Sequence, residues 1–410
     1  MRKVTLSQLR RGNRDLIKAM NRNLILNIVR KHGPISRTHI TNRSGLSVGA
    51  VSQLTNELLE ENWLITAGES ESTGGRPQVM LRLNPHAGTV VGLKLMENRV
   101  VCAVTDLEAT ILYYSERAVT YDHSVDAVAT TLAEVVKHTM FEADVNRKNV
   151  LGVGIGMAGV IDYQQGVVHY SPYFHWQDVS LAGRVTEQLS IPVYLENDVN
   201  TLTIEEQLFG AGRDIANFAV LTVGRGIGLG MVINHQLYQG TPGGVGEIGH
   251  VTMQLHGPAC DCGKWGCLEA IASDPAVVRS ITNALKEGAV SSLKLPVTFA
   301  QIVAAADHGD ALAQQVLHQS GVYLGLGLSM VVNLVHPSLI VVSGEGVQAG
   351  NHRLEPMIES LREHAFNGLM DNVNILVKPM TDETWARGAA SLVVGKLFES
   401  PLLTETLIEA

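Results

Sequence analysis

Residues 260–269 read Cys260-Asp261-Cys262-Gly263-Lys264-Trp265-Gly266-Cys267-Leu268-Glu269 and contain three of the four cysteines of this 410-residue chain. Clustered thiols beside an imidazole are the tetrahedral nitrogen and sulfur donor set of a closed structural zinc site, which leaves no position for a catalytic water. The donor set predicted here is His250, Cys260, Cys262 and Cys267. Gly263 and Gly266 permit the tight backbone that such ligands require. Free buried thiols are the alternative, whereas the reducing interior of a cell disfavours disulfides.

Apolar strands and amphipathic helices alternate on both sides of this loop. Strand patterns cover 90–95, 100–106, 111–119 and 150–156, with a helix pattern over 125–141, and further strand patterns cover 218–223, 228–233 and 339–342. Two α/β halves of similar layout predict a two-lobed protein with a ligand cleft between the lobes.

Four motifs follow one another in the order and spacing of a known family. They are Gly156-Met157-Ala158-Gly159-Val160-Ile161-Asp162, Glu196-Asn197-Asp198-Val199-Asn200, Glu247-Ile248-Gly249-His250 and the cysteine loop. Together they resemble the ROK family (repressors, open reading frames, kinases) over about residues 86–400. The resemblance implies an actin-like, two-lobed sugar-kinase fold. Ala158 departs from the proline of many relatives without removing a polar ligand group.

The resemblance also implies a sugar site. It makes Asn197, Asp198, Glu247, His250 and Glu269 the counterparts of residues that hold sugar hydroxyls, with Asp198 at the position of the kinase general base. Carboxylates suit such a ligand because each accepts hydrogen bonds from hydroxyl groups. Taken singly, Asp198 is as readily explained as a turn-capping carboxylate.

One departure from the family kinases argues against enzymatic activity. Their first body strand leads into an Asp-x-Gly-Gly-Thr loop for magnesium and phosphate, whereas this chain has Lys94-Leu95-Met96-Glu97-Asn98. Bulky and acidic side chains in that loop oppose the backbone contacts and charge neutralisation that phosphoryl transfer needs. A second glycine-rich loop, residues 224–230, is better preserved, and residues 343–346 keep only part of a third. We therefore expect no useful kinase activity.

The first 85 residues, called the head below, contain 13 Lys or Arg and 6 Asp or Glu, while the remaining body, residues 86–410, has 18 and 34. A basic head on an acidic body suggests nucleic-acid binding, although a solvated basic face gives the same count. Apolar periodicity up to Val29, a Gly33-Pro34 stop, a turn at Gly45 and a cap at Ser47 predict a helix-turn-helix. The residues expected to face DNA are Ser36, Arg37, Ser47, Gly49, Ala50, Ser52 and Gln53.

A polar stretch before the strand pattern 79–83 predicts a β-wing whose tip carries Arg76, a side chain suited to a minor groove. An interdomain linker is the alternative interpretation of this stretch. Asn84-Pro85 marks the expected domain boundary.

The expected architecture is therefore a winged helix-turn-helix at 1–85, a first lobe at 86–200, and a second lobe with the zinc site at 201–385. A C-terminal helix, 386–410, would return to the first lobe. We expect a cytoplasmic, homo-oligomeric regulator, dimeric or larger, that binds double-stranded operator DNA, responds to a sugar or sugar phosphate and represses carbohydrate genes. No apolar run is long enough to span a bilayer. The alternatives are an ATP-dependent sugar kinase with a DNA-binding head, and a regulator controlled by a protein partner.

Overall fold

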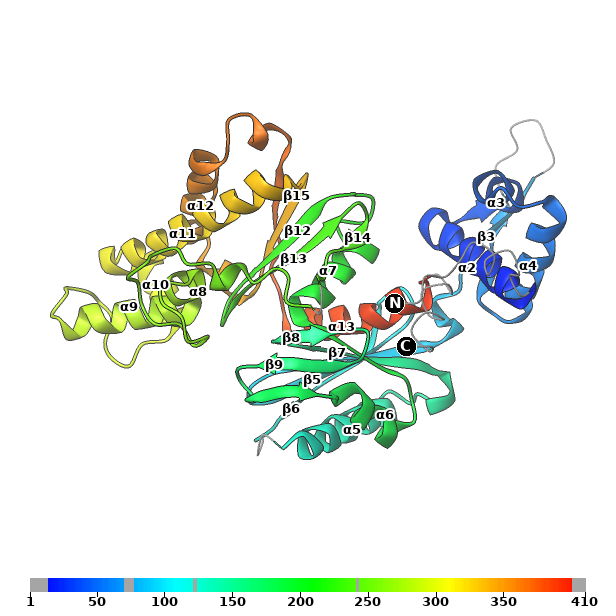
Figure 1. Cartoon of the computed structure of the whole chain (residues 1–410), viewed down its shortest axis with the longest axis horizontal. Coiled ribbons are helices and arrows are strands. Elements are labelled where there is room, and N and C mark those ends of the chain that lie inside the picture. Colours follow the sequence, from blue (N-terminus) through cyan, green and yellow to red (C-terminus); the bar gives the residue numbers. More distant parts are fainter. Residues whose placement is uncertain (1–13, 70–76, 121–123, 241–242, 400–410) are drawn as a thin grey trace.

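A computed structural model describes residues 14–69, 77–120, 124–240 and 243–399 of the chain. The described part of the head consists of three helices and a small sheet of order β1-β3-β2 (Figure 1). Its elements are α2 (Arg14–His32), β1 (Ile35–Ser36), α3 (Arg37–Ser44), α4 (Val48–Glu60), β2 (Leu64–Glu69) and β3 (Val79–Leu83). The strands β2 and β3 are the two arms of the wing, which confirms the winged helix-turn-helix prediction. Arg76 lies outside the described residues.

The caps that the sequence predicts define the two helices of the helix-turn-helix. The Ser36 hydroxyl accepts a hydrogen bond from the His39 amide, and the Ser47 hydroxyl accepts one from the Ala50 amide. Gly45 adopts a left-handed conformation at φ 68° between α3 and α4, which a residue with a β-carbon adopts at a cost. These local interactions set the angle at which α4 crosses α3.

The body contains two five-stranded sheets with the same topology. In each sheet three successive antiparallel strands are followed by two strands that pair in parallel, giving the orders β6-β5-β4-β7-β11 and β14-β13-β12-β15-β16. The first sheet comprises β4 (Thr89–Leu95), β5 (Arg99–Thr105), β6 (Ile111–Ala118), β7 (Val150–Met157) and β11 (Val193–Asn197). The second comprises β12 (Phe218–Val223), β13 (Ile227–Ile233), β14 (Gln236–Leu237), β15 (Leu339–Ser343) and β16 (Asn374–Val377). This repeat is the two-lobed arrangement predicted from the sequence.

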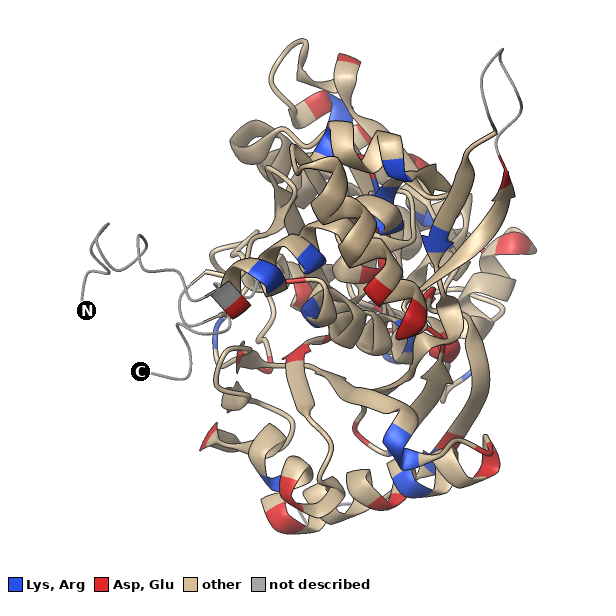
Figure 2. Ribbon diagram, turned by 90° about the vertical axis from the view of Figure 1, so that its right-hand side faces the viewer, with Lys and Arg blue, Asp and Glu red and all other residues tan. Residues whose placement is uncertain are grey.

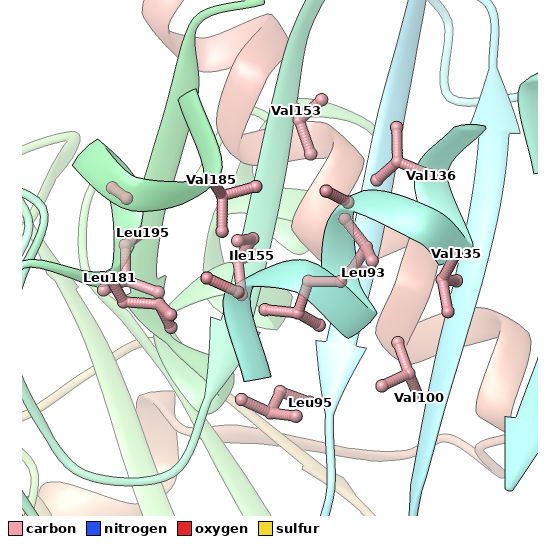
Figure 3. Close-up of a cluster of buried hydrophobic side chains, with 14 of the residues drawn as sticks. Leu93, Leu95, Val100, Val135, Val136, Val153, Ile155, Leu181, Val185 and Leu195 are labelled. Carbon is pink, nitrogen blue, oxygen red and sulfur yellow. The ribbon is translucent and has the colours of Figure 1, made fainter. Parts of the chain in front are cut away.

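Helices cover the outer faces of both sheets. Figure 3 shows α5 (Val125–Glu142) and α6 (Leu181–Leu189) placing Val135, Val136 and Val185 against the valines and leucines of the first sheet. On the second sheet, α11 (Ala311–Val335) and α12 (Asn351–His364) bury an equivalent apolar cluster. The body also contains α8 (Leu268–Ala272), α9 (Asp274–Lys286), α10 (Phe299–Asp307) and a small sheet of β8 (Val160–Asp162), β9 (Val167–Ser171) and β10 (Trp176–Val179).

Two helices, α7 (Asp198–Leu208) and α13 (Asp382–Leu397), lie between the sheets and pack on each other (Figure 1). The helix α13 lies directly on the first sheet. The packing is so close that a β-carbon on Gly154 would be only 1.9 Å from the Ala389 carbonyl oxygen. The domain limits predicted at residues 200 and 386 fall inside α7 and α13. Among the described residues, no helix has the length and apolarity needed to cross a membrane.

Candidate functional site

The predicted metal ligands meet at one point in the second lobe. One ligand atom from each of His250, Cys260, Cys262 and Cys267 lies within 4.8 Å of all the others. His250 Nδ1 is 3.6 Å from Cys260 Sγ, and Cys262 Sγ is 3.7 Å from Cys267 Sγ. Tetrahedral ligands about 2.3 Å from zinc are separated by about 3.8 Å, so the spacing fits the ion.

The backbone of the cysteine loop holds these ligands in place. The Cys260 amide donates to the Lys264 carbonyl at 2.8 Å, and Gly263 and Gly266 have φ angles of 87° and 69°. A β-carbon on Gly266 would lie 1.6 Å from the Gln254 carbonyl oxygen, so a larger residue there would force the loop apart. The loop is therefore built around the ligand cluster.

The ligand cluster also has the proton chemistry of a metal site. Burial raises the pKa of the Cys260 thiol to about 12 and raises the pKa of Cys267 as well, so binding of a metal would release protons. The other ring nitrogen of His250, Nε2, lies 3.8 Å from the Glu247 carboxylate. His250 can thus ligate a metal with Nδ1 while Nε2 faces Glu247, in the manner of an outer-sphere carboxylate.

Asn197 and Asp198 lie where β11 ends and α7 begins. The Asn197 amide oxygen caps α7 by accepting from the Val199 amide at 2.9 Å, and its nitrogen donates to the Gly159 carbonyl at 3.2 Å. Asp198 is 8 % exposed, and its Oδ1 accepts from the Val199 amide. Both side chains therefore stabilise the strand-to-helix turn, and the structure supports the capping interpretation of Asp198.

Lys94, at the end of β4, reaches Asp198 and forms a buried ion pair with its Oδ2. The Lys94 ammonium lies 4.1 Å from the ring centroid of Trp385 on α13, and the indole nitrogen of Trp385 donates to Glu345 at 3.4 Å. Burial lowers the pKa of Lys94, while the charges of Glu345 and Asp382 raise it. A side chain of the protein itself thus neutralises the Asp198 carboxylate, the group that the family resemblance places at the position of a kinase general base.

Glu269 lies against the glycine-rich turn between β12 and β13. Its Oε2 accepts from the Ile227 amide at 3.0 Å. A β-carbon on Gly228 would be 2.5 Å from the Val199 side chain, so this glycine lets the turn pack against α7 beside Asp198. Burial raises the pKa of Glu247, and the negative charge of Glu269 raises it further. The turn therefore connects the carboxylates of the second lobe to the start of α7.

The outer side of α4 is the candidate DNA-binding surface. Gly49 and Gln53 are exposed on it, and Ala50 and Ser52 are half-buried. Arg37 donates to Thr55 and Asn56 at 2.9 Å, so it braces α4 against α3. Ser36 is 2 % exposed and caps α3, which leaves its hydroxyl directed into the head.

The basic charge of the head is only partly visible in the described residues. Figure 2 views the molecule from the side of the head and shows basic and acidic positions interspersed over it. Lys18 and Arg22 form ion pairs with Glu57 and Glu61. Five of the 13 basic residues fall outside the described part, namely Arg2, Lys3, Arg10, Arg11 and Arg76.

The head contacts the body at the C-terminal ends of α7 and α13. Asn27 and Asn23 of α2 donate to the carbonyls of Phe398 and Glu399, both at 2.9 Å, just after α13. Arg213, in the loop after α7, donates to the Arg30 carbonyl at 3.1 Å near the end of α2. Each of the two central helices thus begins beside the pair of Lys94 and Asp198 and ends at the head.

A model of the ROK family matches residues 90–396, and a model of winged helix-turn-helix DNA-binding domains matches residues 21–65. This chain belongs to the ROK family. The xylose repressor of Bacillus subtilis (strain 168) is 29 % identical over 383 residues, 93 % of this chain and 97 % of that protein. The DNA-binding transcriptional dual regulator NagC of Escherichia coli (strain K12) is 28 % identical over 398 residues, 97 % of each chain.

A solved structure of a ROK family transcriptional regulator, described as a homologue of the E. coli MLC protein, superposes with a TM-score of 0.85. It is 26 % identical, and the match covers 96 % of this chain and all of that one. The likeness therefore includes the head as well as the two lobes.

Several residues around Lys94 and Asp198 were not among the predicted site residues. Arg225 and Glu345 each lie between two glycines. A charged residue between glycines is the one feature of the local sequence that could have indicated a functional role for them. Trp385 comes from α13, almost 300 residues from Lys94, and nothing in its own surroundings in the sequence indicates a role at the cleft. On the head, Val48 is 70 % exposed at the start of α4, which places an apolar side chain on the candidate DNA-binding surface.

Proposed function

We propose that this chain is a sugar-responsive transcriptional regulator that represses genes of carbohydrate uptake or metabolism. The observation that carries the proposal is a winged helix-turn-helix joined to a ROK body in which Lys94 pairs with Asp198. The names of the relatives, which include xylose and N-acetylglucosamine repressors, support the same role. The protein would act in the cytoplasm as a dimer on a two-fold symmetric operator.

The effector would bind in the cleft between the lobes. Asn197, Asp198, Glu247, His250 and Glu269 would hold its hydroxyl groups, with the remaining acceptor positions of the carboxylates available to it. Zinc, bound by His250 and the three cysteines, would supply rigidity to the loop that carries His250 and leads into Glu269.

Effector binding would change the DNA affinity by shifting a population of body conformations. Because α7 and α13 both begin at the cleft and end at the head, a change in the lobe angle would move the points that hold α2. Arg213, Asn23 and Asn27 would transmit this movement.

DNA would be contacted by the outer side of α4, by Gly49, Ala50, Ser52 and Gln53, with Ser47 at its start. Arg37 would orient this surface, and Arg76 of the wing would add a contact in the neighbouring minor groove. Ser36, which is buried in the head, would serve by capping α3.

A kinase is the second candidate, because Asp198 is retained at the start of α7 and the turn at 224–230 retains its glycines. We expect no catalysis, since a general base must accept a proton and Lys94 already occupies the carboxylate. Sugar-dependent release of ADP from ATP, lost in Asp198→Asn, would establish the kinase instead.

The test is to retain genomic DNA fragments on the purified protein with and without a panel of sugars and sugar phosphates, and to sequence them. Fragments upstream of carbohydrate genes that one compound releases are the expected result. A double variant, Gly49→Glu and Gln53→Glu, should retain no fragment yet keep its unfolding midpoint. Specific retention that no compound changes would contradict sugar sensing and favour control by a protein partner.

A further inference from the structure

The charges around the cleft carry information about the kind of sugar that binds. We propose that the effector is an uncharged sugar and that the cleft discriminates against its phosphate esters. The inference rests on the proposed function and narrows it to one chemical class. It follows from where the described carboxylates lie and from the partners that the basic side chains already have.

The glycine-rich turn between β12 and β13 is bordered by two carboxylates. At one end, a β-carbon on Gly224 would lie 2.3 Å from Glu345 Oε2, and at the other, one on Gly226 would lie 2.8 Å from Glu269 Oε2. Backbone amides in such turns bind phosphate only when they point freely at the anion. Here the Gly224 amide donates to the Gly226 carbonyl and the Ile227 amide donates to Glu269. An anion at the turn would therefore lie near two carboxylates, and the amides of Gly224 and Ile227 already have acceptors.

The two basic side chains at this point are each paired with a carboxylate. Lys94 is paired with Asp198 under the ring of Trp385, with both ionic groups buried. Arg225, in the turn itself, lies 3.1 Å from the Glu97 carboxylate. A phosphate group would have to share either cation with Asp198 or Glu97, which already compensates its charge, and would lie close to that carboxylate.

The pair of Arg225 and Glu97 joins equivalent positions of the two lobes. Glu97 follows β4 and Arg225 follows β12, which are the corresponding first strands of the two sheets. Each residue therefore lies in the first hairpin turn of its lobe, and the ion pair connects the two turns. The Tyr173 hydroxyl further anchors this segment by donating to the Glu97 carbonyl at 2.7 Å.

Zinc at the His250 and cysteine cluster would not make the surroundings of the sugar site positive. Three thiolates outweigh the two positive charges of the ion, so the loaded site would carry one net negative charge. A phosphate ester carries about −1.5 to −2 charges at neutral pH and loses much of its hydration in a cleft. Glu247, Glu269, Glu345 and the paired Asp198 would repel it, whereas hydroxyl groups can donate hydrogen bonds to the same oxygens.

Calorimetric titration of the full-length protein tests the inference directly. Xylose, glucose and N-acetylglucosamine are each compared with a monophosphate ester of the same sugar. In any pair that binds, the free sugar should bind at least tenfold more tightly than the ester. An ester that binds as tightly as its sugar, or more tightly, would overturn the inference while leaving the sugar-sensing proposal intact. If no probe binds and none releases DNA, the sugar-sensing proposal fails and the inference fails with it.

A charge-removing variant separates electrostatic exclusion from simple lack of space. In Glu97→Gln/Glu345→Gln, Arg225 loses its partner and the turn loses one flanking charge, with little change in volume. The ratio of ester affinity to sugar affinity should rise at least fivefold, and the rise should shrink in high salt. Glu142→Gln, at the exposed end of α5, removes a similar charge from a remote surface and serves as the control. An unchanged ratio in the double variant would show that charge does not set the selectivity.

Discussion

At the scale of single residues, the candidate sugar site contains a buried ion pair, Lys94 with Asp198. Lys94 and Asp198 are 7 % and 8 % exposed, so each depends on the other for compensation of its charge. Removing one member of such a pair leaves an uncompensated charge in a low-dielectric environment, which costs more than removing both.

Lys94→Met should lower the free energy of unfolding by about 3–5 kcal/mol, because it strands the Asp198 carboxylate. The double variant Lys94→Met/Asp198→Asn should lose clearly less than the sum of the two single changes. Urea unfolding measures all three. Arg117→Met, which breaks the exposed pair with Glu134 at 3.3 Å, should cost no more than about 1 kcal/mol. Equal losses in Lys94→Met and Arg117→Met would contradict the buried pairing.

The cluster of His250, Cys260, Cys262 and Cys267 leads to a second prediction at this scale. The protein should purify with about one zinc per chain, and Cys267→Ser should remove most of it, because serine replaces a thiolate ligand of the closed site. Metal analysis measures the zinc content and thermal unfolding measures the unfolding temperature, and both should fall together in Cys267→Ser. Cys102→Ser changes a buried core cysteine outside the cluster and should keep its zinc. Full zinc content in Cys267→Ser would exclude this ligand set.

At the scale of secondary-structure elements, α13 connects the lobes and the head. Its first turns carry Trp385 against Lys94, its middle lies on β4 and β7, and its end meets α2. Glycines in both strands make this close packing possible, since there is no room for a β-carbon beneath the helix.

Gly154→Ala should therefore destabilise the first lobe by about 1–3 kcal/mol or more, because the new methyl group would collide with the Ala389 carbonyl. Gly395→Ala, later in α13, meets neighbours no closer than 3.7 Å and should be neutral or slightly stabilising. Thermal unfolding measures the stability of the two variants relative to the wild type. A neutral Gly154→Ala would mean that α13 can move off the sheet easily.

The contacts between the head and the body predict that sugar binding can be separated from its effect on DNA binding. Asn27→Ala/Arg213→Ala removes hydrogen bonds to the ends of both central helices and leaves the cleft and the α4 surface unchanged. The sugar affinity should stay within twofold of the wild type, whereas the sugar-induced change in operator affinity should fall at least fivefold. Calorimetry and an operator-binding titration give the two numbers. Arg184→Ala, on the far side of the first lobe, is the control, and a full response in the double variant would exclude this route.

At the scale of the whole molecule, the helix-turn-helix head leads to a prediction about assembly on DNA. Operator sites read by helix-turn-helix dimers have half-sites about one helical turn apart or a multiple of it. Light scattering should accordingly give a mass of at least two chains, and a protected footprint should contain two half-sites related by a two-fold axis. A monomer that protects a single half-site would contradict the proposed assembly.

Much of the architecture follows from local sequence. The caps at Ser36 and Ser47, the turn at Gly45, the strand patterns and the cysteine loop are short-range signals, and the structure has each of them at its predicted place. Element ends differ by a residue or two, and α13 begins at Asp382 instead of 386, because the sequence around Thr381 caps the helix earlier than its apolar pattern begins.

The sequence by itself determined that this chain has a winged helix-turn-helix, two α/β lobes and a cluster of one histidine and three cysteines that could bind a metal. Hydrophobic periodicity, capping residues and ligand spacing act over a few residues, so they can be recognised in the sequence. Only the tertiary structure decided that Lys94 pairs with Asp198, that Arg225 meets Glu97, and that α7 and α13 end at the head. Those partners come from segments 100 to 370 residues apart. Their meeting depends on how the two sheets and the central helices pack, which no local pattern encodes.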